Sequence, residues 1–150
     1  MAHTLKVTTV INKPIEEVFD FFSKAGNLNV ITPPGLQFVI TSPLPITMEA
    51  GCLIDYRIKL FGISFKWKTL ISVWQPPFRF VDEQLKGPYV KWHHTHEFRA
   101  LENETTQMTD TVVFQSPGWI LEPLVHYLFV NKRVKQIFSY RGQKLKEIFG

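Results

Sequence analysis

The sequence predicts an α+β fold in which a curved, seven-stranded antiparallel sheet packs against one long C-terminal helix. Within residues 36–115, six segments alternate between apolar and polar side chains, and short turn sequences separate them. This alternation is typical of half-buried strands joined by hairpins. A seventh strand is predicted near the N-terminus, and residues 120–150 carry apolar side chains at helical spacing. A helix cannot fill the concave side of such a sheet, so we expect a cavity between them.

The N-terminal part is expected to form a strand followed by a short helix. Residues 5–11 are β-branched and roughly alternating, which predicts the strand. Asn12 is the expected N-cap of the helix, with Pro14 in its first turn, and Gly26 is expected to end it. The helix should run to about Lys24, with an apolar stripe of Ile15, Val18, Phe19 and Phe22. Residues 27–32 are expected to add a helical turn before the Pro-Pro-Gly sequence at residues 33–35 breaks it.

Six strands with short connections are predicted next, and short connections favour antiparallel neighbours. The expected strands span residues 36–42, 52–61, 63–74, 78–86, 90–100 and 106–115. Turn-forming residues separate them, among them Gly62, Pro76, Gly87 and Asn103. The chain therefore places one long meander between the two helical ends of the sequence.

The last segment is expected to form one long helix over residues 120–150. Pro123 is compatible with it only if the helix begins just before this residue. Arg141 interrupts an apolar stripe that comprises Ile120, Leu124, Tyr127, Val130, Val134, Ile137, Leu145 and Ile148. No internal repeat and no linker divides the sequence, so we expect residues 1–150 to form a single domain.

Composition limits the class of protein. The chain has 150 residues, of which 45% are hydrophobic and 20% charged, which is typical of a globular protein and excludes a disordered one. Its single cysteine, Cys52, cannot form an internal disulfide, so a secreted disulfide scaffold is excluded. The first ten residues have no basic segment before a long apolar run, and no stretch is long enough to span a membrane. We therefore expect a cytoplasmic location.

The positive charge is concentrated at the C-terminal end. The net charge is +4, and residues 120–150 carry all of it. Because no groove-reading motif or interleaved exposed aromatic residues accompany this charge, we expect a solvated helix face and no nucleic-acid partner. Residues 119–130 are apolar around most of the helix, which favours burial. The alternative is a gate, or a transient membrane contact assisted by the basic residues Lys132, Arg133 and Lys135.

Strand parity places an unusual set of polar side chains on the inner, helix-facing side of the sheet. On residues 90–100 the odd positions are mostly charged, whereas the even positions include His94 and His96. A turn near Asn103 places His96 opposite Asp110, and a turn at residues 87–88 places Asp82 opposite Trp92 or His94. The predicted inner face therefore carries Asp82, Gln84, His94, His96 and Asp110 among Phe80, Trp92, Phe98 and Phe114.

Three interpretations of this polar group remain open. Unpaired charges on an apolar face cost several kcal/mol, so the residues must pair, and the first interpretation is a structural Asp–His network. The second is a site that orients the polar end of a ligand. The third is chemistry, either with His94 or His96 as a general base oriented by Asp82 or Asp110, or with a metal bound by His94, His96 and Asp110. We expect no metal and no cofactor, because no nucleophile motif accompanies the group.

Several other residues are expected to face inward or to be inert. Tyr56 and Trp67 should face inward, because lysine and other charged residues alternate with them. Together with Tyr127 on the long helix, they are candidate ligand contacts. Cys52 has no basic neighbour in the sequence and is expected to be an inert core thiol. His126 is expected to be a half-buried helix residue.

The order of elements along the whole chain resembles the START-like superfamily, also called SRPBCC or helix-grip, which includes the pollen-allergen type. The segment FVDEQLKGPYVKWHHTHEF at residues 80–98 resembles a bacterial ligand-binding subfamily of it, and Asp110 and residues 128–141 support that resemblance. The resemblance implies a helix-grip fold. It further implies binding of a hydrophobic molecule such as a lipid, sterol, polyketide or hormone, since these are the superfamily's ligands, and some members are cyclases or dehydratases.

The function predicted from the sequence is therefore binding of a hydrophobic or amphipathic small molecule between the long helix and the sheet. The alternative is an enzyme of aromatase, cyclase or dehydratase type that moves a proton with a His–Asp pair. The predicted ligand contacts are Tyr56, Trp67, Phe80, Asp82, Gln84, Trp92, His94, His96, Phe98, Asp110, Phe114 and Tyr127.

Overall fold

The computed structural model describes residues 2–60, 62–116 and 131–150. These residues form a seven-stranded antiparallel sheet with the strand order β1-β7-β6-β5-β4-β3-β2. Its strands are β1 (His3–Ile11), β2 (Val39–Ile40), β3 (Leu53–Leu60), β4 (Ile63–Gln75), β5 (Arg79–Lys86), β6 (Lys91–Ala100) and β7 (Thr106–Gln115). Sequential strands are neighbours from β2 to β7, and β1 joins β7 at the opposite edge. The predicted fold class and the seven strands are confirmed.

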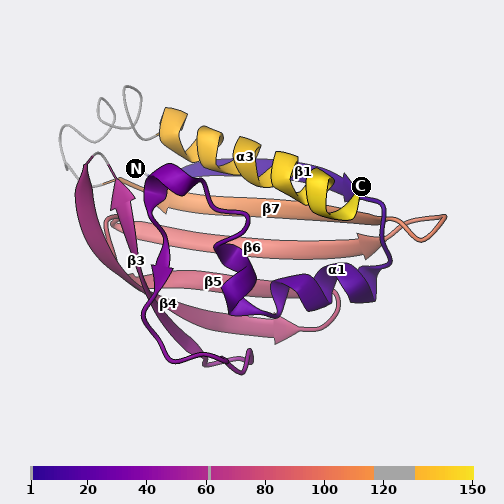
Figure 1. The fold of residues 1–150 in the computed structure, drawn as a ribbon, viewed down its shortest axis with the longest axis horizontal. Helices are drawn as coiled ribbons and strands as arrows, with labels where there is room; N and C mark the ends of the chain where they lie inside the picture. Colours follow the sequence, from indigo (N-terminus) through magenta and orange to yellow (C-terminus); the bar gives the residue numbers. More distant parts are fainter. Residues whose placement is uncertain (1, 61, 117–130) are drawn as a thin grey trace.

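Helical elements cover one face of this sheet (Figure 1). They are α1 (Ile15–Phe22), the 3-10 turns η1 (Ala25–Leu28) and η2 (Pro34–Leu36), and the long α3 (Asn131–Phe149). Figure 1 shows α3 running along β1 and β7, while α1 lies over the ends of the middle strands. One cluster of buried side chains joins α1, β5, β6, β7 and α3. The core therefore lies between the sheet and all of these helices.

The N-terminal helix differs from the prediction at both ends. Pro14 is its N-cap, and the carbonyl oxygen of Pro14 accepts the N–H groups of the first turn. Asn12 is not the cap, because its side-chain amide donates instead to the carbonyl of Gly150, 2.8 Å away. Gly26 lies inside η1, after α1 has ended at Phe22. The predicted apolar stripe of α1 is buried, as expected.

The first strand of the meander is much shorter than the predicted span 36–42. Leu36 belongs to η2, and Gln37 has a left-handed backbone with φ of 48°. Only two residues of this segment therefore pair with β3 as a regular ladder. The Pro-Pro-Gly sequence was expected only to end a helical turn, but Pro34 begins the 3-10 turn η2.

Irregular pairing bends the sheet where the helices leave space. The register between β4 and β5 shifts twice, between Lys68 and Thr69 and between Ile71 and Val73. Such bulges increase local twist and bend a strand. They lie beside the inward-facing residues of β4, of which Trp67, Thr69 and Ile71 are buried. The predicted inward parity of this strand is confirmed.

The described part of the long helix places most of its predicted apolar stripe on the core, whereas Ile148 is exposed. Val134, Phe138 and Leu145 are buried, and Arg141 is buried on the same face. Among the described residues, no helix is long and apolar enough to cross a membrane. The predicted helix start near residue 120, Tyr127 as a ligand contact, and the apolar segment 119–130 as a gate all lie outside the described residues.

Candidate functional site

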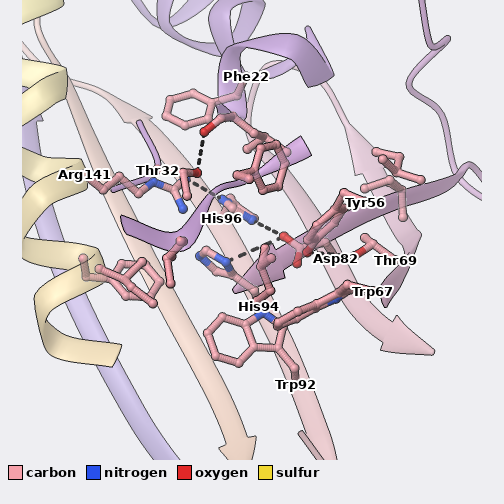
Figure 2. Close-up of a pocket in the computed structure, with 18 of the residues that line it drawn as sticks. Phe22, Thr32, Tyr56, Trp67, Thr69, Asp82, Trp92, His94, His96 and Arg141 are labelled. Atoms are coloured by element: carbon pink, nitrogen blue, oxygen red, sulfur yellow. Dashed lines mark hydrogen bonds and ion pairs between the residues drawn. The ribbon is translucent and has the colours of Figure 1, made fainter. Parts of the chain in front are cut away.

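A cavity of about 140 Å³ lies between α3, the segment from α1 to β3, and the inner face of the sheet. This is far more than the roughly 10–15 Å³ that one water molecule needs. Its wall is mostly aliphatic and aromatic, and Figure 2 shows a group of polar side chains among these residues, in which dashed lines join Arg141, His96, His94 and Asp82. The polar and aromatic lining residues include Tyr56, Trp67, Thr69, Phe80, Asp82, Tyr89, Trp92, His94, His96, Phe138 and Arg141.

The register of β5, β6 and β7 brings the polar group together. Asp82 on β5 is opposite His94 on β6, and His96 is opposite Asp110 on β7. Both registers were among those expected from the turns. Because strand residues two apart share a face, His94 and His96 both point toward the helices. Both histidines and Asp110 are buried.

The hydrogen bonds run diagonally rather than between directly opposite residues. His94 Nε2 is 2.7 Å from Asp110 Oδ1, and His96 Nε2 is 2.5 Å from Asp82 Oδ2. The directly opposite pairs are longer, at 3.7 Å between His94 Nδ1 and Asp82 Oδ2 and 3.4 Å between His96 Nδ1 and Asp110 Oδ1. Diagonal contacts between strands are within the reach of long side chains. Each histidine is thus held by one close carboxylate.

Arg141 completes this cluster from α3. Its Nη2 lies 3.4 Å from His96 Nδ1 and 3.6 Å from Asp110 Oδ1. Its guanidinium carbon is 5.3 Å from the ring centre of Phe22 and 5.7 Å from that of Phe138, within cation–π range. The sequence prediction treated Arg141 only as an interruption of the apolar stripe. The sequence did hold a signal for this role, because Arg141 is a cation on the apolar face of the helix and Asp110 is predicted on the facing side of the sheet.

Stacking fixes the orientation of the histidine rings. The centres of the His94 and His96 rings are 3.6 Å apart, with 26° between their planes. Phe80 stacks on the other side of His96 at 3.9 Å and 11°. Three aromatic rings therefore form a layered column, with Arg141 and the two carboxylates around it. This column leaves the imidazole rings little rotational freedom.

Burial and neighbouring charges set the protonation of the cluster. Burial alone would raise the pKa of Asp110, but the Arg141 guanidinium and the hydrogen bonds from His94 and His96 hold it well below its ordinary value. The pKa of Asp82 is also lowered, since the histidines and Arg141 outweigh its burial. Burial and the neighbouring His96 lower the pKa of His94 to about 4. Near neutral pH, His94 is therefore neutral and both carboxylates are ionised.

These charges assign the protons on the rings. An ionised carboxylate only accepts hydrogen bonds, so the Nε2–H groups of His94 and His96 donate to Asp110 and Asp82. Arg141 Nη2 donates to Nδ1 of His96. Nδ1 of neutral His94 then carries a lone pair, and its one polar contact among the described residues is the Asp82 carboxylate.

A metal ion fits this arrangement poorly. Asp82, His94 and His96 each offer a ligand atom, and these atoms lie within 4.8 Å of one another. However, nearly parallel stacked imidazoles direct their in-plane lone pairs alongside each other rather than toward one point. The Arg141 cation beside His96 also disfavours a second cation there. The group differs from the metal alternative considered from the sequence, which used Asp110 in place of Asp82.

The predicted ligand contacts separate into three groups. The residues that line the cavity are Tyr56, Trp67, Phe80, Asp82, Trp92, His94 and His96. Gln84, Phe98, Asp110 and Phe114 do not line it: Phe98 packs in the core with α1, Phe114 packs near Tyr89, and Asp110 lies behind the histidines. Tyr127 lies outside the described residues. Sequence reasoning missed Leu36, Phe38 and Met48, since their segment lacks a regular period that would assign faces.

Gln84 stabilises a turn instead of contacting the cavity. Its side chain donates to the carbonyl of Tyr89 at 2.6 Å and accepts the Tyr89 N–H at 3.1 Å. Gly87 lies against it, and a Cβ at this glycine would come within 2.5 Å of the Gln84 amide oxygen. Parity placed Gln84 on the inner face but could not show that both ends of its amide bind the backbone of Tyr89 in the turn.

We expect Gln84→Ala to lower the free energy of unfolding by about 1–2 kcal/mol, because two hydrogen bonds between side chain and turn are lost. Denaturant unfolding monitored by circular dichroism would measure it. Glu83→Ala, at the neighbouring position on the other face of β5, is the control and should change stability by less than about 0.5 kcal/mol. Equal effects of the two substitutions would contradict the role assigned to Gln84.

Comparison with known proteins identifies the fold. No protein-family model and no curated protein matches the chain. Among solved structures, protein Ms6760 from Mycobacterium smegmatis has a TM-score of 0.70 at 15% identity, covering 97% of this chain and 89% of its own. The Zhui aromatase/cyclase from Streptomyces sp. R1128 has a TM-score of 0.69 at 13% identity, and the match covers 96% of this chain and 94% of that one. Major latex-like protein 151 from Panax ginseng has a TM-score of 0.68 at 11% identity, and the match covers 99% of this chain and 97% of that one.

These matches define the class by architecture. Each covers nearly all of both chains, although few residues are identical. The protein therefore has the helix-grip fold, which the resemblance of its sequence to the START-like superfamily implied. Since one fold carries many functions, the function must be argued from the site.

Proposed function

We propose that this protein binds a hydrophobic or amphipathic small molecule, of lipid, polyketide or isoprenoid type, in the cavity between α3 and the sheet. The observation that carries the proposal is the contrast within the cavity wall. Most of the wall is apolar, and one hydrogen-bonded group of charged residues lies on one side (Figure 2). Small-molecule sites typically combine an apolar wall with a few polar groups that orient the ligand.

The aromatic part of the wall would supply most of the contact area. Tyr56 stacks on Trp67 with ring centres 5.5 Å apart, and Trp92 meets Trp67 edge-on at 5.5 Å. Burying apolar ligand surface against such rings contributes roughly 25 cal/mol per Å² before ordering costs. The stacked histidines and Asp82 would face the polar end of the same ligand.

An enzyme of cyclase or dehydratase type is the second candidate. The His94–Asp110 pair, with the other ring nitrogen of His94 left unprotonated, has the arrangement of an oriented general base. One structural neighbour is an aromatase/cyclase. However, general bases work best with a pKa near the working pH, and the pKa of His94 is about 4. The site therefore favours hydrogen bonding to a ligand over proton abstraction from it.

Filling the cavity tests the proposal. We expect 4-propylphenol to bind to the wild-type protein and Thr69→Phe to weaken that binding at least about tenfold. Thr69 is a buried lining residue, so a phenyl ring there occupies the ligand's space. Titration calorimetry would measure both affinities, and mass spectrometry under native conditions would show whether the compound is recovered unchanged.

The matched control is Ser64→Phe, which adds the same ring to an exposed position of β4. It should leave the affinity within about twofold of the wild type. A melting transition in both variants would confirm that they fold. Unchanged affinity in Thr69→Phe, or no measurable binding to the wild-type protein, would count against a ligand in this cavity.

A further inference from the structure

Among the charged and histidine side chains that line the cavity, the carboxylate of Asp82 is the most exposed. The Asp82 side chain is 19% exposed, compared with 5% for His94 and 2% for His96. Its two close partners among the described residues, His94 and His96, both approach Oδ2. Figure 2 shows Asp82 between the two histidines and Tyr56, with dashed lines from its carboxylate to both histidines and Trp67 nearby.

Apart from Tyr56, the donor groups on the same wall are covered or already used. The indole N–H of Trp67 and the Nε–H of Arg141 are buried and have no accepting partner among the described residues. The hydroxyl groups of Thr32 and Thr69 donate within the protein, to the carbonyl of Leu28 and to the oxygen of Tyr56. A ligand therefore meets acceptors more readily than donors on this side of the cavity.

Tyr56 is the complementary group beside Asp82. Burial, with a contribution from the charge of Asp82, raises the pKa of the Tyr56 phenol, so it stays protonated. Its oxygen accepts from Thr69 Oγ1 at 3.4 Å, which leaves the Tyr56 O–H group able to donate. A ligand hydroxyl both donates and accepts, so it suits an ionised carboxylate and a phenol together. An ammonium group lacks the acceptor, and a carboxylate lacks the donor.

We propose that the cavity selects amphipathic ligands whose polar end is a neutral alcohol or phenol hydroxyl, which donates to Asp82, and that it discriminates against ligands ending in a carboxylate. This inference rests on the proposed function, and it adds the chemistry of the ligand's polar end. The physical basis is that a buried carboxylate strengthens a hydrogen bond from a hydroxyl and repels a second carboxylate.

A matched ligand series on the wild-type protein tests this selectivity without any substitution. The probes are propylbenzene, 4-propylphenol and 4-propylbenzoate, which share one apolar body, titrated at pH 7 by calorimetry. We expect the phenol to bind at least about tenfold more tightly than propylbenzene, equivalent to about 1.4 kcal/mol. The benzoate should bind more weakly than propylbenzene.

The outcomes separate this inference from the proposed function. Equal affinities for propylbenzene and the phenol would overturn the selectivity while leaving an apolar binding cavity. Tighter binding of the benzoate would also overturn it and would assign the polar end to Arg141. If none of the three compounds binds, both the selectivity and the proposed function fail.

The Asp82→Asn variant tests whether Asp82 causes the preference for 4-propylphenol over propylbenzene. The preference for the phenol over propylbenzene should fall to within about twofold, and a melting transition would report that the variant is folded. The control is Asp55→Asn on β3, whose carboxylate is 47% exposed and 3.8 Å from Lys68. This control should keep the wild-type preference. If Asp82→Asn retained the full preference, Asp82 would not be the acceptor.

Discussion

Replacing Asp110 with alanine is expected to lower the free energy of unfolding by about 3–5 kcal/mol, because it breaks a buried ionic network from one side. Asp110 is 2% exposed and accepts a hydrogen bond from His94. It is also the carboxylate nearest to Arg141 among the described residues, with 3.6 Å between Oδ1 and Nη2. Without it, the guanidinium stays buried on α3 with no close carboxylate.

Denaturant unfolding would measure this loss, with Asp55→Ala as the control. Asp55 pairs with Lys68 at the surface, and such a pair contributes less than about 1 kcal/mol. A double variant, Asp110→Leu with Arg141→Met, removes both charges and should be more stable than Asp110→Ala alone. If the double variant were less stable than the single one, the loss would come from packing rather than from the unpaired cation.

Acid is expected to destabilise the protein by up to about 3 kcal/mol between pH 7 and pH 4 through His94 alone. In the unfolded chain its pKa is near 6.5, whereas burial and His96 lower the folded value to about 4. Below pH 6.5 the unfolded state therefore binds the proton more readily, and stability falls as the pH drops toward 4. The lowered pKa values of Asp82 and Asp110 act in the same direction at lower pH.

Unfolding free energies measured at several pH values from 7 to 4 would test this. His94→Gln should flatten the pH dependence in this range. His93→Gln, at the adjacent position on the opposite face of β6, should keep it. A steeper loss of stability in His94→Gln than in the wild type would contradict the assignment of a neutral, buried His94.

The meander could be predicted well because its physics is local. A strand alternates its faces every residue, so polar and apolar side chains in β4, β6 and β7 reveal their inner side. Short turns then set the register, which placed His96 opposite Asp110 and Asp82 near His94. The same reasoning failed for residues 36–42, where the left-handed Gln37 and the turn of η2 interrupt the alternation.

The details of the candidate site could be predicted less well from the sequence. Which carboxylate each histidine binds depends on side-chain rotamers. In the structure the close pairs are the diagonal ones, in which His94 binds Asp110 and His96 binds Asp82. Gln84 faces the expected region, but the turn takes both ends of its amide. Leu36, Phe38 and Met48 also line the cavity. They belong to an irregular segment whose position over the sheet depends on tertiary contacts and not on a local pattern.

The sequence by itself determined that a curved antiparallel sheet would carry two histidines and two aspartates on its inner face, because strand period and turn spacing are local properties of the chain. Only the tertiary structure decided that Arg141 balances their charge, since α3 meets β6 and β7 through contacts between residues far apart in the sequence. It likewise decided that Asp82 is more exposed than the histidines and Arg141 that line the cavity with it. Burial and charge pairing depend on where every neighbour lies, and no local pattern encodes that.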